Sequence, residues 1–295
     1  MSDMPSLGQP AILFAEECDR GTLRPDNQDS VLHVRIAMGE LMIVADGIGG
    51  YTGGATASRM VVEHFYAHLA SLPADYPAES AIREAAARAN TAVLAAAIAP
   101  DSPNRRMGST VVVALLQQEG DATNAWIGHV GDSRAYLWRV GRLHRLTNDH
   151  SAVQSMLDRS LITPEEAEHH PDASVLTRSL GHQTTVEIDI EQHPLAVGDT
   201  LLLCSDGLWG FVPEQEIEKA AAGVTVQGAA HQLLELALAT GGHDNIGIEI
   251  ARIIQPPAVH PPRNEQAGRL LTSILTIFLL AVAGLLLLVY FVLFR

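Results

Sequence analysis

Short apolar runs separated by polar turns are the main pattern of the chain up to residue 254. Runs of this length that are rich in Val, Ile and Leu and bounded by Gly, Asp or Asn are typical of β-strands. Strands are therefore predicted over residues 41–45, 110–116, 125–130, 135–140, 200–204 and 246–254. Because most of the turns between them are short, we expect antiparallel hairpins rather than a regular βαβ series.

Three longer segments carry apolar residues at spacings of three and four, which predicts amphipathic helices. They cover residues 55–70, 79–98 and 226–240, and the first two follow one another between the first predicted strand and the later ones. Residues 148–180 are polar instead and contain the sequence TPEE, so a small helical excursion is predicted there.

The last part of the chain has a different pattern, because residues 270–294 include no charged side chain. A helix of these 25 residues would rise roughly 37 Å, which exceeds the roughly 30 Å of bilayer hydrocarbon. We predict a membrane-spanning helix in contact with lipid and, since only Arg295 follows it, a single-pass C-terminal anchor. A buried core helix is the alternative, but such helices are shorter and keep a polar face.

Residues 255–269 contain four prolines and no apolar period, which predicts a semi-stiff linker between a folded body and the anchor. Arg263 and Arg269 lie on the body side of the span, and this bias favours a cytoplasmic body at the cell membrane. The first 20 residues have neither a basic start nor a long apolar core, so no signal peptide is predicted.

The charged residues and cysteines narrow the possible classes of function. The 295 residues carry 19 basic and 34 acidic side chains, and this excess of acid argues against a nucleic-acid partner. The single lysine, Lys219, lies in EQEIEKAAAG, which matches neither a Walker A loop nor the lysine strand of a protein kinase. Cys18 and Cys204 cannot form a disulfide framework, which favours a reducing compartment.

Aspartates recur at the tips of the predicted strands. Asp46 and Asp206 each end an apolar run and precede a glycine, and Asp244 precedes the last strand. Asp132 lies in a tight turn between two other predicted strands. Turn formation alone explains any one of them, since Asp-Gly is a common hairpin signal. Several carboxylates at one edge would repel unless a cation joined them, and all-oxygen ligands favour Mg²⁺ or Mn²⁺ over zinc.

The loop after Asp46 adds a second constraint, because five glycines crowd positions 47–54 directly before a predicted helix. Such a loop lets the backbone approach a ligand or metal closely, although flexibility alone would also explain it. A dinucleotide-binding fingerprint fails on spacing, since the position that would need its third glycine is Thr52.

Eight short motifs, in order, resemble the PPM-type protein serine/threonine phosphatases, also called type 2C, in their bacterial form. They are RPDNQDS (24–30), ADGIGG (45–50), MGSTVV (107–112), GHVGDSRAY (128–136), LTNDHS (146–151), LTRSLG (176–181), LLLCSDGLWGFV (201–212) and GGHDNIGIEI (241–250). The resemblance covers residues 10–254, which would form one catalytic domain. It implies an α/β fold, a four-layer αββα sandwich of two antiparallel sheets flanked by helices. Residues 148–180 would include the family's mobile flap.

The resemblance also implies which residues hold metal. Asp46 would bridge two Mg²⁺ or Mn²⁺ ions, with the carbonyl of Gly47 bound to one of them. Asp206 and Asp244 would complete the other site. Asp132 would help to bind a third, weaker ion, as in bacterial members of the family.

The remaining matched residues would act around the substrate. By resemblance, Arg24 would hold the phosphate oxygens, for which its bidentate guanidinium is suited. Asp29 would orient the attacking water, and Asn245 would support the same water network. Gln28 stands where many relatives carry Glu, which is expected to weaken a water-mediated contact to one ion. Ile48 replaces a histidine proposed as the general acid in some eukaryotic relatives, so we hypothesise that water at the metals protonates the leaving group.

These expectations combine into a membrane-tethered phosphatase acting on phosphoserine and phosphothreonine in proteins, by water activated between two ions. A serine/threonine kinase system is the expected partner. Two alternatives stay open: a non-catalytic pseudophosphatase that serves as a docking module, and a hydrolase of small phosphate esters. His150 could act as an acid, but a structural hydrogen bond is an equally good interpretation.

Overall fold

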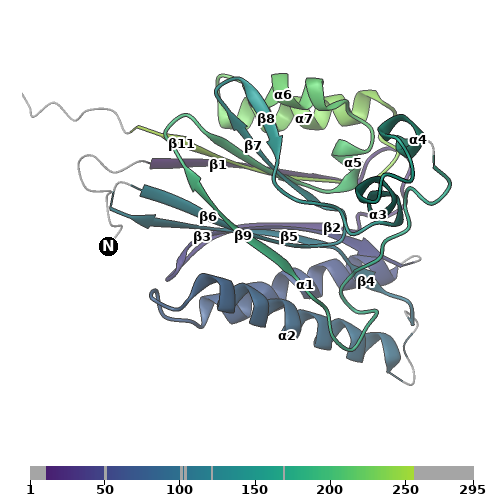
Figure 1. The fold of residues 1–295 in the computed structure, drawn as a ribbon. Coiled ribbons are helices and arrows are strands. Elements are labelled where there is room, and N and C mark those ends of the chain that lie inside the picture. Colours follow the sequence, from purple (N-terminus) through teal and green to yellow (C-terminus); the bar gives the residue numbers. More distant parts are fainter. Residues whose placement is uncertain are drawn as a thin grey trace, which may run out of the picture. The chain divides into compact units, whose positions relative to one another are not determined.

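The computed structural model describes residues 11–255, apart from positions 50, 51, 100, 101, 103, 104, 121 and 169. The chain divides into two units, Met1–Pro256 and Pro257–Arg295, and all described residues belong to the first. In this unit two antiparallel sheets lie face to face, with helices on both outer sides (Figure 1). The predicted four-layer sandwich is therefore confirmed.

Both sheets are entirely antiparallel. The five-stranded sheet runs in the order β1 (Ala11–Asp19), β11 (Ile246–Ile254), β10 (Thr200–Cys204), β7 (Arg134–Arg139) and β8 (Arg142–Arg145). The six-stranded sheet runs in the order β2 (Asp29–Ile36), β3 (Gly39–Ile48), β5 (Val111–Glu119), β6 (Ala122–Val130) and β9 (Asp189–Leu195), with β4 (Gly108–Ser109) paired to β3.

Helices cover the outer face of each sheet (Figure 1). The six-stranded sheet is covered by α1 (Thr52–Ala70) and α2 (Ala78–Ile98), and the five-stranded sheet by α6 (Glu214–Ala221) and α7 (Val226–Ala239). The three predicted helices are confirmed within a few residues. The predicted polar excursion carries α3 (Ala152–Asp158) and α4 (Pro164–Glu168), and one further turn, α5 (Asp206–Trp209), follows β10.

The apolar core forms three layers, and β3 shows how one strand serves two of them. Leu41 and Ile43 pack beneath α1 and α2, whereas Met42 and Val44 face the opposite sheet. Successive side chains of a strand point to opposite faces, so a strand covered on both sides must be apolar throughout. This explains the unbroken apolar runs in the sequence, and it makes the sandwich a rigid support for residues at the strand ends.

The predicted membrane anchor falls largely outside the described part of the chain. No helix within residues 11–255 combines the length and apolar character that crossing a bilayer requires. The predicted span at residues 270–294 and, apart from Gln255, the predicted linker at residues 255–269 lie outside the described residues.

Candidate active site

Strand direction brings the predicted site aspartates to one end of the sandwich. Asp29 opens β2 and lies opposite Asp46, near the end of its antiparallel neighbour β3. In the other sheet, the end of β10, which leads into Asp206, lies beside the start of β11, which follows Asp244. The start of β7 also lies beside the end of β10, and the turn before it carries Asp132. These five residues are called the acid cluster below.

Mutual repulsion is strong within the acid cluster because little water reaches it. Burial raises the pKa of Asp46 well above its usual range, and Asp206, Asp29, Asp132 and Asp244 raise it further. Burial likewise raises the pKa of Asp206, helped by Asp132 and Asp244. Burial, with a contribution from Asp244, raises the pKa of Asp29 to about 7. Several buried or half-buried carboxylates with raised pKa values mark a site that a divalent cation would stabilise.

Asp29 has one carboxylate oxygen bonded and one without a partner. The Ser205 hydroxyl donates to Asp29 Oδ2 at 2.6 Å, and the N–H of Gly247 fixes that hydroxyl at 2.9 Å. Asp29 Oδ1 is buried and has no hydrogen-bond partner among the described residues. The Asp46 carboxyl can bond to it only while one of the two acids is protonated. An unpartnered carboxylate oxygen beside other carboxylates has the donor chemistry that Mg²⁺ or Mn²⁺ requires.

The backbone around Asp46 is fixed by the end of β4 and the residue that follows it. The N–H of Thr110 and the hydroxyl of Ser109 donate to the Asp46 carbonyl at 2.8 and 2.9 Å, and the Asp46 N–H donates to the Thr110 hydroxyl at 3.0 Å. At Gly47 only glycine fits, because a Cβ would overlap the carbonyl oxygen of Gly54. The glycine after Asp46 thus lets two backbone segments pass in close contact.

Arg24 lies at the exposed rim of the acid cluster. Its Nη2 is 2.6 Å from Asp244 Oδ2, and the Arg24 side chain is 50% exposed. The loop that carries Arg24 is held by Asn245, whose Oδ1 accepts the Gln28 N–H at 2.8 Å. The Asn245 amide nitrogen donates to the carbonyls of Arg20 and Asp26 at 2.8 and 3.0 Å. Asn245 was assigned to a water network by resemblance, but in the structure its side chain binds the backbone of the Arg24 loop.

The side chain of Gln28 packs against the glycine-rich loop rather than standing apart from it. A Cβ at Gly54 would overlap Gln28 Oε1, and the Gln28 carbonyl accepts the Gly47 N–H at 3.1 Å. Gln28 therefore helps to shape the loop next to Asp46, and its weakened water-mediated contact to one ion stays a prediction.

Comparison with known proteins agrees with this geometry. The family description Protein phosphatase 2C matches residues 24–239, which include Arg24, Asp46 and Asp206. The chain belongs to the protein phosphatase 2C family.

The matches between this protein phosphatase 2C chain and two relatives cover different fractions of the relatives' lengths. The serine/threonine protein phosphatase PstP of Mycobacterium tuberculosis is 37% identical over 246 residues, which make up 82% of this chain and 45% of PstP. The serine/threonine phosphatase stp of Listeria monocytogenes is 35% identical over 236 residues, 78% of this chain and 91% of stp. The match thus spans less than half of PstP, and both relatives are named serine/threonine phosphatases.

A solved structure of the PstP catalytic domain in complex with two manganese ions has the same fold. Its TM-score is 0.73 at 33% identity, and the match covers 84% of this chain and 100% of that one. The described strands and helices are therefore those of the protein phosphatase 2C fold.

A second polar cluster, which sequence reasoning missed, lies beside Asp132 in this protein phosphatase 2C domain. Arg134 Nη2 and Nε lie 2.7 and 3.0 Å from the carboxylate oxygens of Asp149, and the guanidinium lies 3.4 Å from the centre of the Trp209 ring. Trp209 Nε1 donates to the Asp132 carbonyl at 2.9 Å. Arg134, Asp149 and Trp209 are called the Arg134 cluster below. Its members lie in three of the eight motifs quoted above, but their spacing in the sequence does not predict that they contact one another.

Asp132 belongs to both clusters. Burial and the nearby Asp149 raise the pKa of Asp132 to about 6, against the opposing effect of Arg134. Its carboxylate lies close enough to the other aspartates to raise the pKa values of both Asp46 and Asp206. The pKa of Asp132 is therefore less strongly perturbed than that of Asp46.

The two interpretations of His150 are separated by its contacts. The ring is buried, Nδ1 accepts the Gly131 N–H at 3.2 Å, and Nε2 lies 3.2 Å from Asp189 Oδ2. Because both ring nitrogens already have protein partners, the structural interpretation fits and the acid interpretation does not.

Proposed function

We propose that this chain removes phosphate from phosphoserine and phosphothreonine in proteins with the help of two Mg²⁺ or Mn²⁺ ions. The acid cluster carries the proposal, because five carboxylates from two sheets converge on one buried edge with their charge largely uncompensated. The names of the relatives and the two manganese ions of a solved relative support the same chemistry.

The donor set fits hard divalent cations, since every predicted ligand offers oxygen. Asp46 would bridge the two ions, the Gly47 carbonyl would bind one of them, and Asp206 and Asp244 would bind the other. Asp132 would serve a third, weaker site. When bound, such ions lower the pKa of a water held between them and offset charge on the phosphoryl oxygens.

The chain's own residues bind the phosphate and orient the water. Arg24 is exposed enough to present two N–H groups to phosphate oxygens, and because it contacts Asp244, a phosphate bound to it would lie at the edge of the acid cluster. Asp29 Oδ2 already accepts a hydrogen bond from Ser205, so Oδ1, which has no hydrogen-bond partner among the described residues, is the atom that would accept a hydrogen bond from the attacking water. Ser205 thereby fixes which oxygen of Asp29 is used.

Direct attack by water agrees with the state of the two cysteines. Cys18 is exposed on one side, but partial burial of its thiol, with a contribution from Asp29, raises its pKa to about 11. Burial also raises the pKa of Cys204. Neither thiol forms a thiolate readily near neutral pH, so neither is suited to act as a covalent nucleophile.

Membrane tethering through residues 270–294 is part of the proposal. It is supported by the 25 uncharged residues of that segment and by Arg263 and Arg269 on the side of the catalytic domain. Holding the phosphatase at the cytoplasmic face would raise its concentration near membrane-bound serine/threonine kinases or their targets.

Phosphate release from a phosphothreonine peptide tests the catalytic part of the proposal. The full chain should release phosphate with Mn²⁺ and lose this activity with EDTA, and Asp46→Asn should reduce kcat by roughly 10³-fold or more. Asp75→Asn, an exposed aspartate in the α1–α2 connection, is the matched control and should retain full activity. Absence of release with any divalent ion would favour the docking module, and release only from a small aryl phosphate would favour a small-ester hydrolase.

Cell fractionation tests the tether. The full chain should sediment with membranes, and Leu285→Arg combined with Leu287→Arg should release it, because two charges at the centre of a span are costly to insert. The pair Leu285→Ala and Leu287→Ala is the control that shortens the same side chains without adding charge. Sedimentation that is unchanged by the two arginines would refute the tether.

A further inference from the structure

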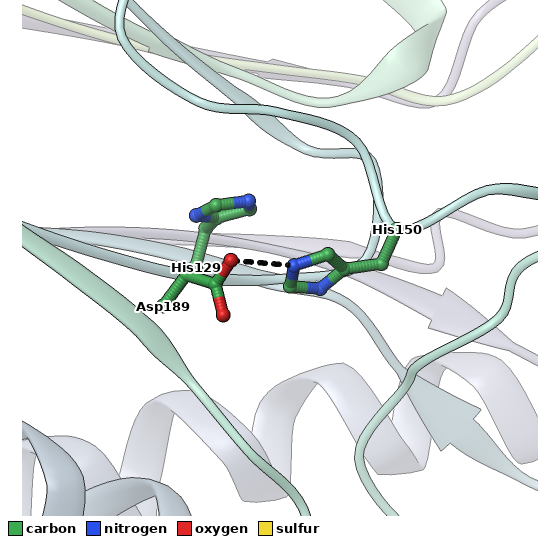
Figure 2. A group of neighbouring side chains, drawn as sticks. All are labelled: His129, His150 and Asp189. Carbon is green, nitrogen blue, oxygen red and sulfur yellow. Dashed lines mark hydrogen bonds and ion pairs between the residues drawn. The ribbon is translucent and has the colours of Figure 1, made fainter. Parts of the chain in front are cut away.

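His129, His150 and Asp189 form a group that resembles a metal site (Figure 2). One ligand atom of each lies within 4.8 Å of the others. A metal ion, however, must lie in the plane of each imidazole that binds it, and these rings stack 4.6 Å apart with their planes 22° from parallel. Arg178 Nη1 also lies 3.2 Å from His150 Nε2 and 2.8 Å from Asp189 Oδ1, where it already supplies positive charge. The group is therefore better explained by its hydrogen bonds.

The hydrogen bonds of His150 select one form of its ring. Nδ1 must carry a lone pair to accept the Gly131 N–H at 3.2 Å, so in the neutral ring the proton lies on Nε2 and is donated to Asp189 Oδ2. Arg178 Nη1, which can only donate, then donates to Asp189 Oδ1 at 2.8 Å and not to the ring nitrogen 3.2 Å away. Burial lowers the pKa of His150, and the neighbouring His129 lowers it further, which keeps the ring neutral as this arrangement requires. One imidazole thus connects the loop just before Asp132 with the start of β9.

The backbone at His150 joins the same loop to the two ends of the polar excursion. The His150 N–H donates to the Gly131 carbonyl at 2.9 Å, and the Thr177 N–H donates to the His150 carbonyl at 2.8 Å. Ser151 forms an antiparallel bridge with Leu176. Residues 152–175, called the flap segment here, therefore leave and re-enter the domain as a paired ribbon beside His150.

We propose that His150, Arg178 and Asp189 form a clasp that fastens both ends of the flap segment to β9 and holds the Asp132 loop in register with them. The three are positioning residues, since they contact neither the predicted metal ligands nor the substrate site directly. The part of the proposal that concerns Asp132 rests on the proposed function. The part that concerns the flap segment does not depend on it.

Two substitutions of His150 separate its contact with Gly131 from its contact with Asp189. In His150→Asn the side-chain oxygen takes the place of Nδ1 and can accept the Gly131 N–H, but the side chain is too short to reach Asp189. In His150→Gln the amide nitrogen takes the place of Nε2 and can reach Asp189, but no acceptor remains at the position of Nδ1. Glu191→Gln, two residues further along β9 and exposed, is the matched control.

Two measurements on the full chain report the two contacts separately: one follows opening of the flap segment, and the other follows the response to Mn²⁺. The rate of trypsin cleavage after Arg159, an exposed residue that follows α3 in the flap segment, measures opening of that segment. The Mn²⁺ concentration that gives half of the maximal rise in melting temperature measures the metal response. Asp132→Asn is the reference variant, because it removes the predicted ligand next to Gly131. Neither readout requires a phosphate ester, so a failure of the proposed function would not be mistaken for a failure of the clasp.

The clasp predicts opposite results for the two variants. His150→Asn should be cleaved about 5-fold faster than the parent with an unchanged Mn²⁺ response, which is the size expected for one lost hydrogen bond. His150→Gln should show the parental cleavage rate and require about 5-fold more Mn²⁺, in the direction of Asp132→Asn. Parallel changes in both readouts for both variants, in proportion to a lower melting temperature, would overturn the clasp. An unchanged Mn²⁺ response in Asp132→Asn would refute the link to the metal site.

Discussion

The acid cluster and the Arg134 cluster are both buried polar groups at one end of the sandwich, and they differ in how their charge is balanced. In the Arg134 cluster, Asp149 accepts hydrogen bonds from Arg134 and lies 3.0 Å from Arg145. In the acid cluster, the one ion pair between described residues is that of Asp244 with Arg24, at the exposed rim. A fold tolerates buried charge when partners compensate it, so the uncompensated cluster is the one built for an external cation.

The largest effect expected from this difference is a pH dependence of the metal-free protein. Burial raises the folded-state pKa of Asp29 from 3.8 to about 7, and it raises those of Asp46 and Asp206 as well. The folded state thus holds protons more tightly than the unfolded chain, and stability is lost as pH rises from about 4 to about 7. Together these carboxyls should cost several kcal/mol, since one pKa unit corresponds to about 1.4 kcal/mol.

Urea unfolding of the full chain in EDTA at pH 5 and pH 8 measures this loss. Mn²⁺ should stabilise the protein much more at pH 8 than at pH 5, because the ligands must be deprotonated to bind it. Asp46→Asn should flatten the pH dependence in EDTA and make the metal-free protein more stable at pH 8. A metal-free protein as stable at pH 8 as at pH 5 would show that the acid cluster is not under electrostatic strain.

The next largest effect is expected from breaking the compensated cluster. Asp149→Asn leaves the guanidinium of Arg134 buried without its counter-charge, and removing one partner of a buried ion pair costs about 3–5 kcal/mol. Urea unfolding with saturating Mn²⁺ measures the change while the acid cluster stays neutralised.

An exposed ion pair provides the control for Asp149→Asn. Glu79→Gln removes the partner of Arg83 on the surface of α2, where both side chains are about half exposed, and should cost no more than about 0.5 kcal/mol. The double variant Arg134→Met and Asp149→Leu should recover much of the stability lost in Asp149→Asn, because apolar residues of similar volume need no counter-charge. Equal losses for Asp149→Asn and Glu79→Gln would contradict the compensation argument.

The same contrast explains why the sequence predicted one cluster and not the other. Asp46, Asp206 and Asp244 stand next to apolar strands and glycine or asparagine, so their placement at strand tips is visible locally. Arg134 and Asp149 are 15 residues apart, and their contact depends on how the chain returns after β8. Side-chain pairs set by a tertiary turn have no signature in spacing, which is also why the contacts of Asn245 with its neighbouring loop were not foreseen.

Partial exposure explains why two of the elements, β9 and α6, were missed from the sequence. β3, β5, β10 and β11 are central strands with continuous apolar runs and were predicted. The edge strand β9 reads DIEQHPL and buries only its last residue, Leu195. The short helix α6 reads EQEIEKAA and buries Ile217 with two alanines. Exposed edges and short helices need few apolar residues, so their pattern is too weak to distinguish them from a loop.

The smallest effect concerns a third kind of buried charge, the isolated Glu249 on β11. Its side chain is buried on the face of β11 that also carries Ala251 and Ile253, in the layer between the sheets, and neither carboxyl oxygen has a hydrogen-bond partner among the described residues. Burial, helped by the facing Glu16 and opposed by the nearby backbone of Leu32 and Ile43, raises its pKa well above the usual range, so its ionisation opposes folding as pH rises above about 4.5. Glu249→Met removes an unpaired polar group at similar volume and should stabilise the Mn²⁺-bound protein by about 1–3 kcal/mol in urea unfolding at pH 7.

Glu63→Met, on the exposed face of α1, is the control for Glu249→Met and should change stability by no more than about 0.5 kcal/mol. The gain from Glu249→Met should shrink toward pH 4, where the carboxyl is protonated in both states. A gain independent of pH would mean that shape rather than charge limits this position, whereas a loss would reveal a partner of Glu249 and place it with the compensated cluster.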